Sequence, residues 1–320
     1  MAFYSEEAFY LKEMEMYELS RKKAKRMVIR HTAHGTSKRE ARSLALITSV
    51  GTERNYTQAT SNYLEWCSQN DIAPGLRANK TVLKNYLDER SEWIQQKTLD
   101  MERQALQLLY KQKLAYVKSI NPTILAKRSY TTVQANQIAR CQTKRNSIST
   151  LLALHAGVRA HELATILPIN ERTPSQHRQW DSMRFTGFPE FVRYTVIGKG
   201  GLCREIGVPV WLSSLLEARR RNEPLQVRDR QIFYTSFYDI GFGQAWSQSF
   251  TDASKKALGF STGGHGLRHS YAKKRLYELE RAFELLIHRT NLTSAREEAL
   301  KVLSQELGHF RIDVTYAYLR

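Results

Sequence analysis

Cysteines, acidic residues and long apolar runs are all scarce in this sequence. Only three cysteines occur, Cys67, Cys141 and Cys203, and no two of them are close in sequence. This argues against a disulfide framework and against a cysteine zinc site, and it fits a reducing cytosol. No apolar run approaches membrane-spanning length, and residues 1–7 are acidic rather than basic, so we expect neither a membrane segment nor a secretory signal.

The shortage of acidic residues leaves a large positive charge. The chain has 49 basic and 31 acidic residues, so its formal net charge is 49 − 31 = +18. A solubilising surface is the simplest explanation, but an excess of this size more often indicates a polyanionic partner, and nucleic acid is the leading candidate. Such binding would weaken steeply with salt, because each neutralised phosphate releases counterions.

The 320 residues allow about two domains, and a hydrophobic content of 42% supplies an ordinary core. We interpret residues 1–48 as an N-terminal arm, with an amphipathic helix at 3–19 followed by a basic segment. Residues 49–120 form a helical unit, 121–130 a linker, and 131–320 a second unit. Basic residues of the arm and the helical unit are candidate contacts for DNA phosphates, with a solvated surface as the alternative. These candidates are Arg21, Lys22, Lys23, Lys25, Arg26, Lys80 and Lys84.

Helix signals occur in both units. In the helical unit, Thr52, Asn79 and Thr98 each predict the N-terminal cap of a helix. In the second unit, Thr131 with Gln134 predicts a capping box. We expect the helix that follows, at 144–156, to stop at Gly157, and another helix to open at Val158.

The second unit also contains the clearest strand signal. Residues 191–197 are β-prone, 198–201 form a glycine-rich turn, and 204–208 lead back, so we predict a β-hairpin. The last helical segment carries a capping box, Ser294 to Glu297, and ends at Gly308. We expect the other helices of this unit at 212–221, 244–258, 266–288 and 294–307. The predicted fold class is mainly α (α+β), with a small antiparallel β-sheet.

Residues that could break a phosphodiester occur in order along the second unit. Transesterification requires an in-line nucleophile, cations on the non-bridging oxygens and a proton donor for the departing oxygen. A tyrosine hydroxyl can attack from a positive pocket, and an arginine can donate two hydrogen bonds to two phosphate oxygens. Each residue alone has an ordinary structural explanation, such as a surface arginine, a hairpin lysine or a packed tyrosine. The candidates are Arg159, Lys199, His265, Arg268, His309 and Tyr318.

Four motifs carry these residues. They are HAGVRAHEL at 155–163, IGKGG at 197–201, HGLRHSYA at 265–272, and LGH at 307–309, followed by Tyr318 nine residues after its histidine. In this order and setting, the sequence resembles the tyrosine recombinase/phage integrase family of site-specific DNA recombinases. The resemblance covers the chain from about residue 130 to its end. More loosely, the upstream helical unit looks like the family's core-binding domain.

The resemblance implies a catalytic role for each candidate. Tyr318 would attack the scissile phosphate and leave a 3′-phosphotyrosyl link with a free 5′-hydroxyl. Arg159 and Arg268 would hold the phosphate, and Lys199 on the hairpin turn would protonate the leaving 5′-oxygen. Tyr316 is the competing nucleophile, but the nine-residue spacing after the histidine favours Tyr318.

The resemblance also implies roles for the supporting residues. His265 would assist proton transfer with the nucleophile, and His309 would donate a hydrogen bond to the phosphate. Glu162, three residues after Arg159, would brace the site. No metal or other cofactor is implied, because the phosphotyrosine keeps the bond energy.

The assembly that the resemblance implies is a C-shaped clamp around double-stranded DNA that carries specific recombination sites. Four protomers would act on two duplexes, with accessory DNA-bending or directionality proteins as further partners. We expect a cytoplasmic, nucleoid-associated enzyme that integrates or excises a mobile element. Two alternatives stay open: type IB topoisomerase-like DNA relaxation, and a non-catalytic, sequence-specific DNA-binding regulator on the same scaffold.

Two features depart from the family pattern. Arg268 and His309 are farther apart than is typical, which predicts a lengthened helix and loop around 288–293. The sequence ends at Arg320, whereas many relatives carry a tail beyond the tyrosine that docks on a neighbouring protomer. Either the chain is truncated or its protomers communicate in another way, and the segment 3–19 is our candidate for that contact.

Overall fold

The structure of this protein is a computed structural model, and its contacts divide the chain into two compact units, Met1–Ile124 and Leu125–Arg320. The predicted helix at 3–19 and the residues Arg21 and Lys25 fall wholly or largely outside the residues that the structure describes. So do Lys199 and the Ser294 side chain of the last predicted capping box. The described residues are 49–73, 79–122, 127–198, 200–286 and 292–319, with the backbone alone at 286 and 292–294, together with Glu15, Tyr17, Glu18, Lys22–Ala24, Arg26 and Ile47.

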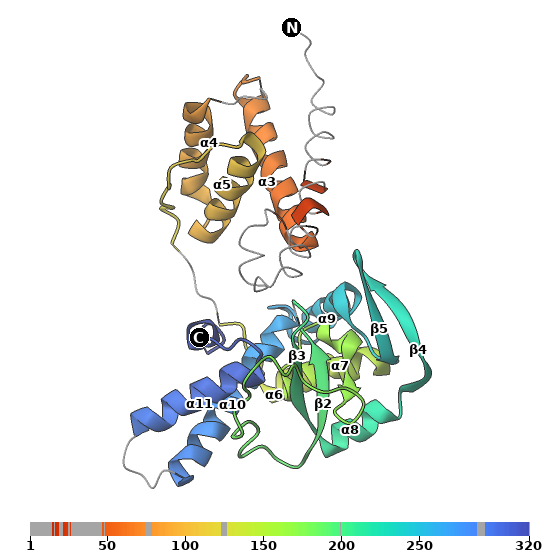
Figure 1. Cartoon of the computed structure of the whole chain (residues 1–320). Coiled ribbons are helices and arrows are strands. Elements are labelled where there is room, and N and C mark those ends of the chain that lie inside the picture. Colours follow the sequence, from red (N-terminus) through yellow and green to blue (C-terminus); the bar gives the residue numbers. More distant parts are fainter. Residues whose placement is uncertain are drawn as a thin grey trace. The chain divides into compact units, whose positions relative to one another are not determined.

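The described part of the first unit is helical, as the sequence predicts. Its helices are α3 (Val50–Gln69), α4 (Lys80–Trp93) and α5 (Gln96–Tyr110) (Figure 1). Aromatic residues fill the space between them, because rings from all three helices meet at centroid distances of 5.2 to 6.3 Å. These rings belong to Tyr63, Trp66, Tyr86 and Tyr110.

Two of the three helix caps predicted for the first unit are wrong. Asn79 caps α4 as predicted, since its side chain accepts a hydrogen bond from the Thr81 amide. Ser49, and not Thr52, caps α3: its hydroxyl accepts from the Thr52 amide at 3.1 Å, so Thr52 is the third helical residue. Thr98 is likewise inside α5, which begins at Gln96 after an N-cap residue that makes no side-chain hydrogen bond.

A three-stranded antiparallel sheet lies at the centre of the second unit. Its strand order is β1 (Leu167–Pro168), β2 (Phe191–Ile197) and β3 (Cys203–Pro209), and Ile197 pairs with Cys203 at the turn. The predicted hairpin is therefore confirmed. Alternate residues of β2 and β3 pack on the helices in one hydrophobic core, and every residue of β3 is buried.

Helices surround this sheet. The predicted capping box of α6 is confirmed, with hydrogen bonds of 2.9 and 3.2 Å between Thr131 and Gln134. The long helices α10 and α11 lie side by side (Figure 1), around a core that includes Tyr271 and Leu303. The helices of this unit are α6 (Thr132–Arg140), α7 (Lys144–Ala156), α8 (Val210–Glu217), α9 (Gly243–Leu258), α10 (His265–Leu286), α11 (Leu292–Glu306) and α12 (Ile312–Tyr316).

Two helix predictions in this unit are wrong. The helix expected to open at Val158 is a loop followed by η1 (Glu162–Thr165), a single 3₁₀ turn, because the Glu162 side chain accepts from the Arg159 backbone and the chain then enters β1. The helix expected at 212–221 ends at Glu217. The chain continues into a second hairpin that the sequence reading missed, β4 (Arg220–Asp229) with β5 (Ile232–Tyr238).

The β4–β5 hairpin lies on the side of the second unit away from α10 and α11 (Figure 1). Its turn places Arg230 at φ +57, and the Asp229 carboxylate accepts from the Gln244 amide at the start of α9. The unit is mainly α with small antiparallel sheets, so the predicted fold class is confirmed. In the described ranges, no helix combines the length and apolar character that a bilayer crossing requires.

Candidate active site

The structure gathers most of the predicted site residues around the ring of Tyr318. Ring centroids of His265 and His309 lie 5.3 and 4.9 Å from that of Tyr318, and the Arg268 guanidinium lies 5.5 Å from it. These groups come from separate elements: the start of α10, the segment between α11 and α12, and the turn after α12. Residues from motifs that are separate in the sequence therefore form a single cluster in space.

Gly157 sets the path of the loop that carries Arg159. It follows α7 with φ +59, a conformation that favours glycine, and thus ends the helix as predicted. A Cβ at this position would lie 2.4 Å from the Tyr271 ring, so there is no room for a side chain. The Gly157 carbonyl accepts hydrogen bonds from both Arg268 and Arg204, which ties the loop to α10 and β3.

Glu162 is the anionic centre of the cluster. Its carboxylate is fully buried and accepts from the Arg159 guanidinium at 2.6 Å, from the Arg159 backbone at 2.9 Å, and from Arg204 at 2.7 Å. Arg268 lies 4.0 Å from the same carboxylate. Burial raises the pKa of Glu162, but these three guanidinium groups outweigh it and hold the pKa well below its usual range. Glu162 is therefore ionised and forms an ion pair with Arg159.

Arg268 is buried completely at the base of the site. It donates to the carbonyls of Gly157 and Leu307, and its Nη2 lies 3.3 Å from His309 Nε2. Burial, followed by the charges of Arg159 and Arg204, lowers the pKa of Arg268 to about 9. It remains a cation at neutral pH.

Arg159 is more accessible, with 22% of its side chain exposed. Burial lowers its pKa, but the nearby Glu162 carboxylate and Tyr318 raise it by more, so the net shift is upward. Arg159 therefore lies close to both the Glu162 carboxylate and Tyr318. Its exposed portion can donate to an incoming anion.

The histidines of the site are neutral at physiological pH. Burial, and then the charge of Arg268, lowers the pKa of His265 to about 4 and that of His309 to about 3. A neutral imidazole donates from one ring nitrogen and accepts at the other, so each can pass a proton or hold a phosphate oxygen. Within the described residues, no group of His, Cys, Asp and Glu side chains is placed to hold a metal ion.

The two candidate nucleophiles differ sharply in their surroundings. Tyr318 is 9% exposed and packs among the site histidines, whereas Tyr316, at the end of α12, is 44% exposed. The geometry thus brings Tyr318 to the arginines and histidines. Lys199 lies outside the described residues, but its neighbour Gly198 is close to the site: a Cβ there would lie 3.2 Å from the Glu162 carboxylate.

The predicted DNA-contacting residues belong to the first unit. Lys22, Lys23, Arg26, Lys80 and Lys84 are all exposed. Lys22 pairs with Glu18 at 2.8 Å, and Lys84 pairs with Asp88 on the same helix. Exposed lysines of this kind can exchange such partners for phosphates, because surface ion pairs contribute little stability.

Three residues that contact the site were not singled out from the sequence. The His269 ring lies 4.8 Å from Tyr318, and Arg204 and Glu306 take part in the buried charge network beneath it. His269 was within a quoted motif, and its place four residues after His265, on one face of a helix, was the available signal. Arg204 and Glu306 had no local signal, because their partners are remote in sequence.

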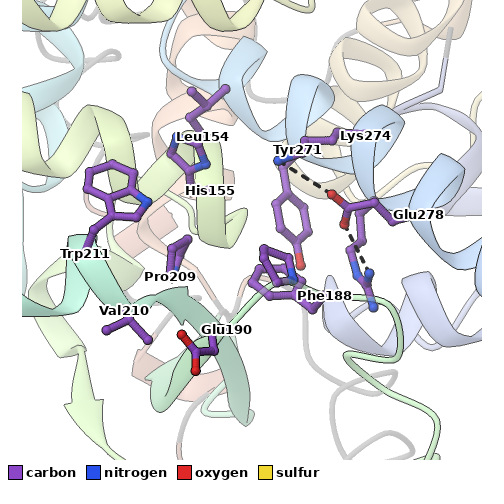
Figure 2. Close-up of a pocket in the computed structure, with 12 residues that line it drawn as sticks. Leu154, His155, Phe188, Glu190, Pro209, Val210, Trp211, Tyr271, Lys274 and Glu278 are labelled. Atoms are coloured by element: carbon purple, nitrogen blue, oxygen red, sulfur yellow. Dashed lines mark hydrogen bonds and ion pairs between the residues drawn. The ribbon is translucent and has the colours of Figure 1, made fainter.

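A separate pocket of about 540 Å³ lies between α7, α8 and α10, and Figure 2 shows its lining. None of the predicted site residues line this pocket. Trp211 and His155 stand on one side and Tyr271 on the other, with Lys274 and Glu278 beside it (Figure 2). Because the Tyr271 ring also packs on Gly157, it forms a wall shared by the pocket and the loop that carries Arg159.

No protein-family model and no curated protein matches the sequence. Solved structures do match the fold. A XerH site-specific recombinase bound to a palindromic difH substrate, in a post-cleavage complex, is 16% identical over 88% of this chain and 78% of that chain, with a TM-score of 0.50. The pre-cleavage XerH complex is 17% identical over the same shares, with a TM-score of 0.49. The Tn1549 transposon integrase in complex with circular intermediate DNA is 11% identical over 83% of this chain and 89% of that chain, with a TM-score of 0.47. For the fold, the resemblance predicted from the motifs is confirmed: this chain has the fold of the tyrosine recombinases.

Proposed function

We propose that this protein is a site-specific DNA recombinase or integrase that cuts and rejoins DNA through a 3′-phosphotyrosyl intermediate. The observation that carries the proposal is the setting of Tyr318, whose ring packs against His265 and His309 beside the buried Arg268. A cluster with three arginines and one carboxylate has an excess of positive charge, which suits a phosphodiester. The fold supports the same conclusion.

The proposed reaction assigns one task to each group. Arg159 and Arg268 donate hydrogen bonds to the non-bridging oxygens, and the Tyr318 oxygen attacks phosphorus as its proton leaves toward a neutral histidine. The bond from phosphorus to the 5′-oxygen breaks, and Lys199 supplies the proton that this oxygen takes up. Attack by a 5′-hydroxyl on the phosphotyrosine reverses these steps and rejoins the DNA.

Double-stranded DNA is the proposed partner. The net charge of +18 favours a polyanion, and the XerH recombinase with a similar fold is solved with a difH substrate. We further propose that four protomers act on two duplexes that carry specific sites, and that the reaction integrates or excises a mobile element. Accessory DNA-bending or directionality proteins belong to the same proposal.

A suicide-substrate assay tests the proposed function. A duplex that the chain protects in footprinting is resynthesised with a nick close to the protected centre, so that cleavage releases a short fragment and traps the intermediate. We expect a covalent protein–DNA adduct that forms equally well in the presence of a chelator. Relaxation of plasmid DNA without strand exchange would instead support a topoisomerase.

Two conservative variants identify the nucleophile. Tyr318→Phe should abolish the adduct, because phenylalanine keeps the ring packing but lacks the attacking oxygen. Tyr316→Phe is the matched control and should form the adduct at the wild-type level, since Tyr316 is exposed. Loss of the adduct in Tyr316→Phe alone would contradict the assignment, and no adduct with the wild-type chain on a protected duplex would support a non-catalytic regulator.

A further inference from the structure

Arg204 is a buried cation that none of the steps above uses. It lies on β3, five residues after Lys199, and the residue is 1% exposed. Its guanidinium donates to the Glu162 carboxylate at 2.7 Å, to the Glu306 carbonyl at 2.7 Å and to the Gly157 carbonyl at 3.3 Å. Arg204 therefore holds three segments that are distant in sequence.

Each of these three acceptors is linked to a proposed catalytic residue. Glu162 carries the ion pair to Arg159, and the Gly157 carbonyl is shared with Arg268. The Glu306 carbonyl ends α11, directly before the segment that contains His309. The Arg204 side chain thus binds three groups, and these hold the two proposed phosphate-binding arginines and the segment that contains His309.

Gly308 shows how closely Arg204 is fitted to that segment. A Cβ on Gly308 would lie 2.8 Å from Arg204 Cδ, and its backbone has φ +69. The glycine therefore serves two purposes: it ends α11 as predicted, and it leaves space for the Arg204 side chain to reach the Glu306 carbonyl. The next residue in the chain is His309.

The end of α11 is also fixed from the opposite side. The Glu306 side chain accepts from the Tyr271 hydroxyl at 3.1 Å and from Arg275 at 2.9 Å. It also accepts from the Phe185 amide at 2.8 Å. Tyr271 is the residue seen at the wall of the pocket in Figure 2. With this carboxylate anchored, the hydrogen bond from Arg204 sets where the Glu306 carbonyl and the following residues lie.

We propose that Arg204 is a positioning residue for DNA cleavage, which acts on Arg159, Arg268 and His309 through Glu162, Gly157 and the end of α11. The proposal rests on the proposed function. Arg204 acts through the residues that it positions, so its effect is on the rate of the chemical step and not on DNA affinity. The task requires arginine, because a planar guanidinium donates in several fixed directions, whereas a lysine ammonium is a flexible point charge.

Single-turnover cleavage of the suicide duplex at saturating enzyme separates the rate from DNA affinity. The variants Arg204→Lys and Arg204→Met keep the side-chain volume, and the first also keeps the charge. We expect both to cleave more slowly, by up to about 100-fold, because small misplacements of catalytic groups have effects of this size. DNA affinity by fluorescence anisotropy should stay within about twofold of wild type.

Arg184→Lys is the matched control. Arg184 forms a largely buried ion pair at 2.6 Å with Glu205, the neighbour of Arg204 on β3, whose side chain leaves the opposite face of the strand. This variant loosens the same strand without touching Glu162, so it should lower the melting temperature but keep the wild-type cleavage rate. Rates are compared at a temperature where circular dichroism shows each variant to be folded.

Hydrogen exchange gives a readout that does not depend on activity. Arg204→Met should lose amide protection at residues 304–310, while Arg184→Lys should keep it. If Arg204→Met does not fold, Arg204→Lys carries the same measurements. Wild-type cleavage rates in both Arg204 variants, or an equal slowing in Arg184→Lys, would overturn the proposal and leave the proposed function intact. The absence of any adduct with the wild-type chain would instead remove the proposed function, and with it the reaction that Arg204 serves.

Discussion

The positive charge of the site comes from guanidinium groups and not from imidazolium groups. Arg159, Arg204 and Arg268 share the single carboxylate of Glu162, and burial, followed by the charge of Arg268, keeps the nearby His265 and His309 neutral. The two kinds of group can therefore serve different chemical purposes. The arginines stay charged over the whole physiological pH range and can hold an anion, while the neutral imidazoles remain able to take or give a proton.

The depressed histidine pKa values predict how stability depends on pH. The pKa values of His265 and His309 are about 4 and about 3 in the folded chain, below the ordinary value of 6.5. Between pH 6.5 and about 4, the unfolded chain therefore binds protons that the folded chain does not. The free energy of unfolding should keep its full value above pH 6.5, and it should fall as the pH drops toward 4. Urea unfolding followed by circular dichroism at a series of pH values measures this slope.

Replacement of one histidine isolates its share of the effect. His309→Gln removes a proton-binding group from the unfolded chain, so the stability of this variant should fall less steeply below pH 6.5. His177→Gln, at an exposed position, is the control and should keep the wild-type slope. Equal slopes for His309→Gln and wild type would show that His309 is not held neutral by its buried surroundings.

Local signals predicted the elements that depend on local chemistry. The capping box at Thr131, the stop at Gly157 and the β2–β3 turn each follow from a few adjacent residues, and the structure has all three. The β4–β5 hairpin was missed because its turn at Arg230 lacks the glycine or asparagine that marks such turns. Its position is secured by a contact that is remote in sequence, from Asp229 to the start of α9.

In the candidate site, too, residues with a local sequence signal could be predicted, and residues that depend on remote contacts could not. Motif residues such as Arg268 and Tyr318 could be predicted because their order and spacing are distinctive. Arg204 and Glu306 could not, because their importance arises only when β3 and the end of α11 meet. A charged residue in a strand is ordinarily read as a solvent-facing position, and only the folded chain shows that Arg204 is buried against Glu162.

Gly157 and Gly259 both have positive φ, but their replacement by alanine should cost different amounts of stability. Gly259 has φ +79, and an added Cβ would meet nothing within 4 Å, so Gly259→Ala should cost only the backbone strain, about 1–2 kcal/mol. Gly157→Ala adds a clash at 2.4 Å with the Tyr271 ring. We expect it to cost about 3 kcal/mol or more, measured by urea unfolding.

Cleavage should separate these two variants further. The Gly157 carbonyl binds Arg268 and Arg204, so its displacement should slow adduct formation in the molecules that remain folded. Gly259→Ala should cleave at the wild-type rate, since Gly259 ends α9 and contacts none of these groups. Equal stability losses in the two variants would mean that the Tyr271 ring moves aside readily, and that the loop is not fixed by this contact.

At the scale of the whole molecule, the excess of basic residues is much larger than the site requires. The net charge is +18, whereas the cluster around Glu162 contributes three arginines against one carboxylate. Most of the positive charge therefore lies elsewhere, including the exposed lysines Lys80 and Lys84 on α4. For the proposed recombinase, charge that is distributed in this way would contribute to DNA affinity more than to the chemical step.

This distribution predicts a steep dependence of DNA binding on salt. Each phosphate contact contributes about −0.9 to the slope of log K against log salt, so six to ten contacts would weaken binding by about 10³ to 10⁵ between 50 and 200 mM salt. Replacing Lys80 and Lys84 with alanine should reduce the slope by up to about 2 if both contact phosphates. Lys301→Ala, at an exposed position paired with Glu298 on α11, is the comparison and should leave the slope unchanged. Fluorescence anisotropy titrations on the footprinted duplex measure all three slopes. An unchanged slope in the Lys80 and Lys84 variant would place the phosphate contacts elsewhere on the chain, and a flat wild-type slope would contradict the electrostatic origin of binding altogether.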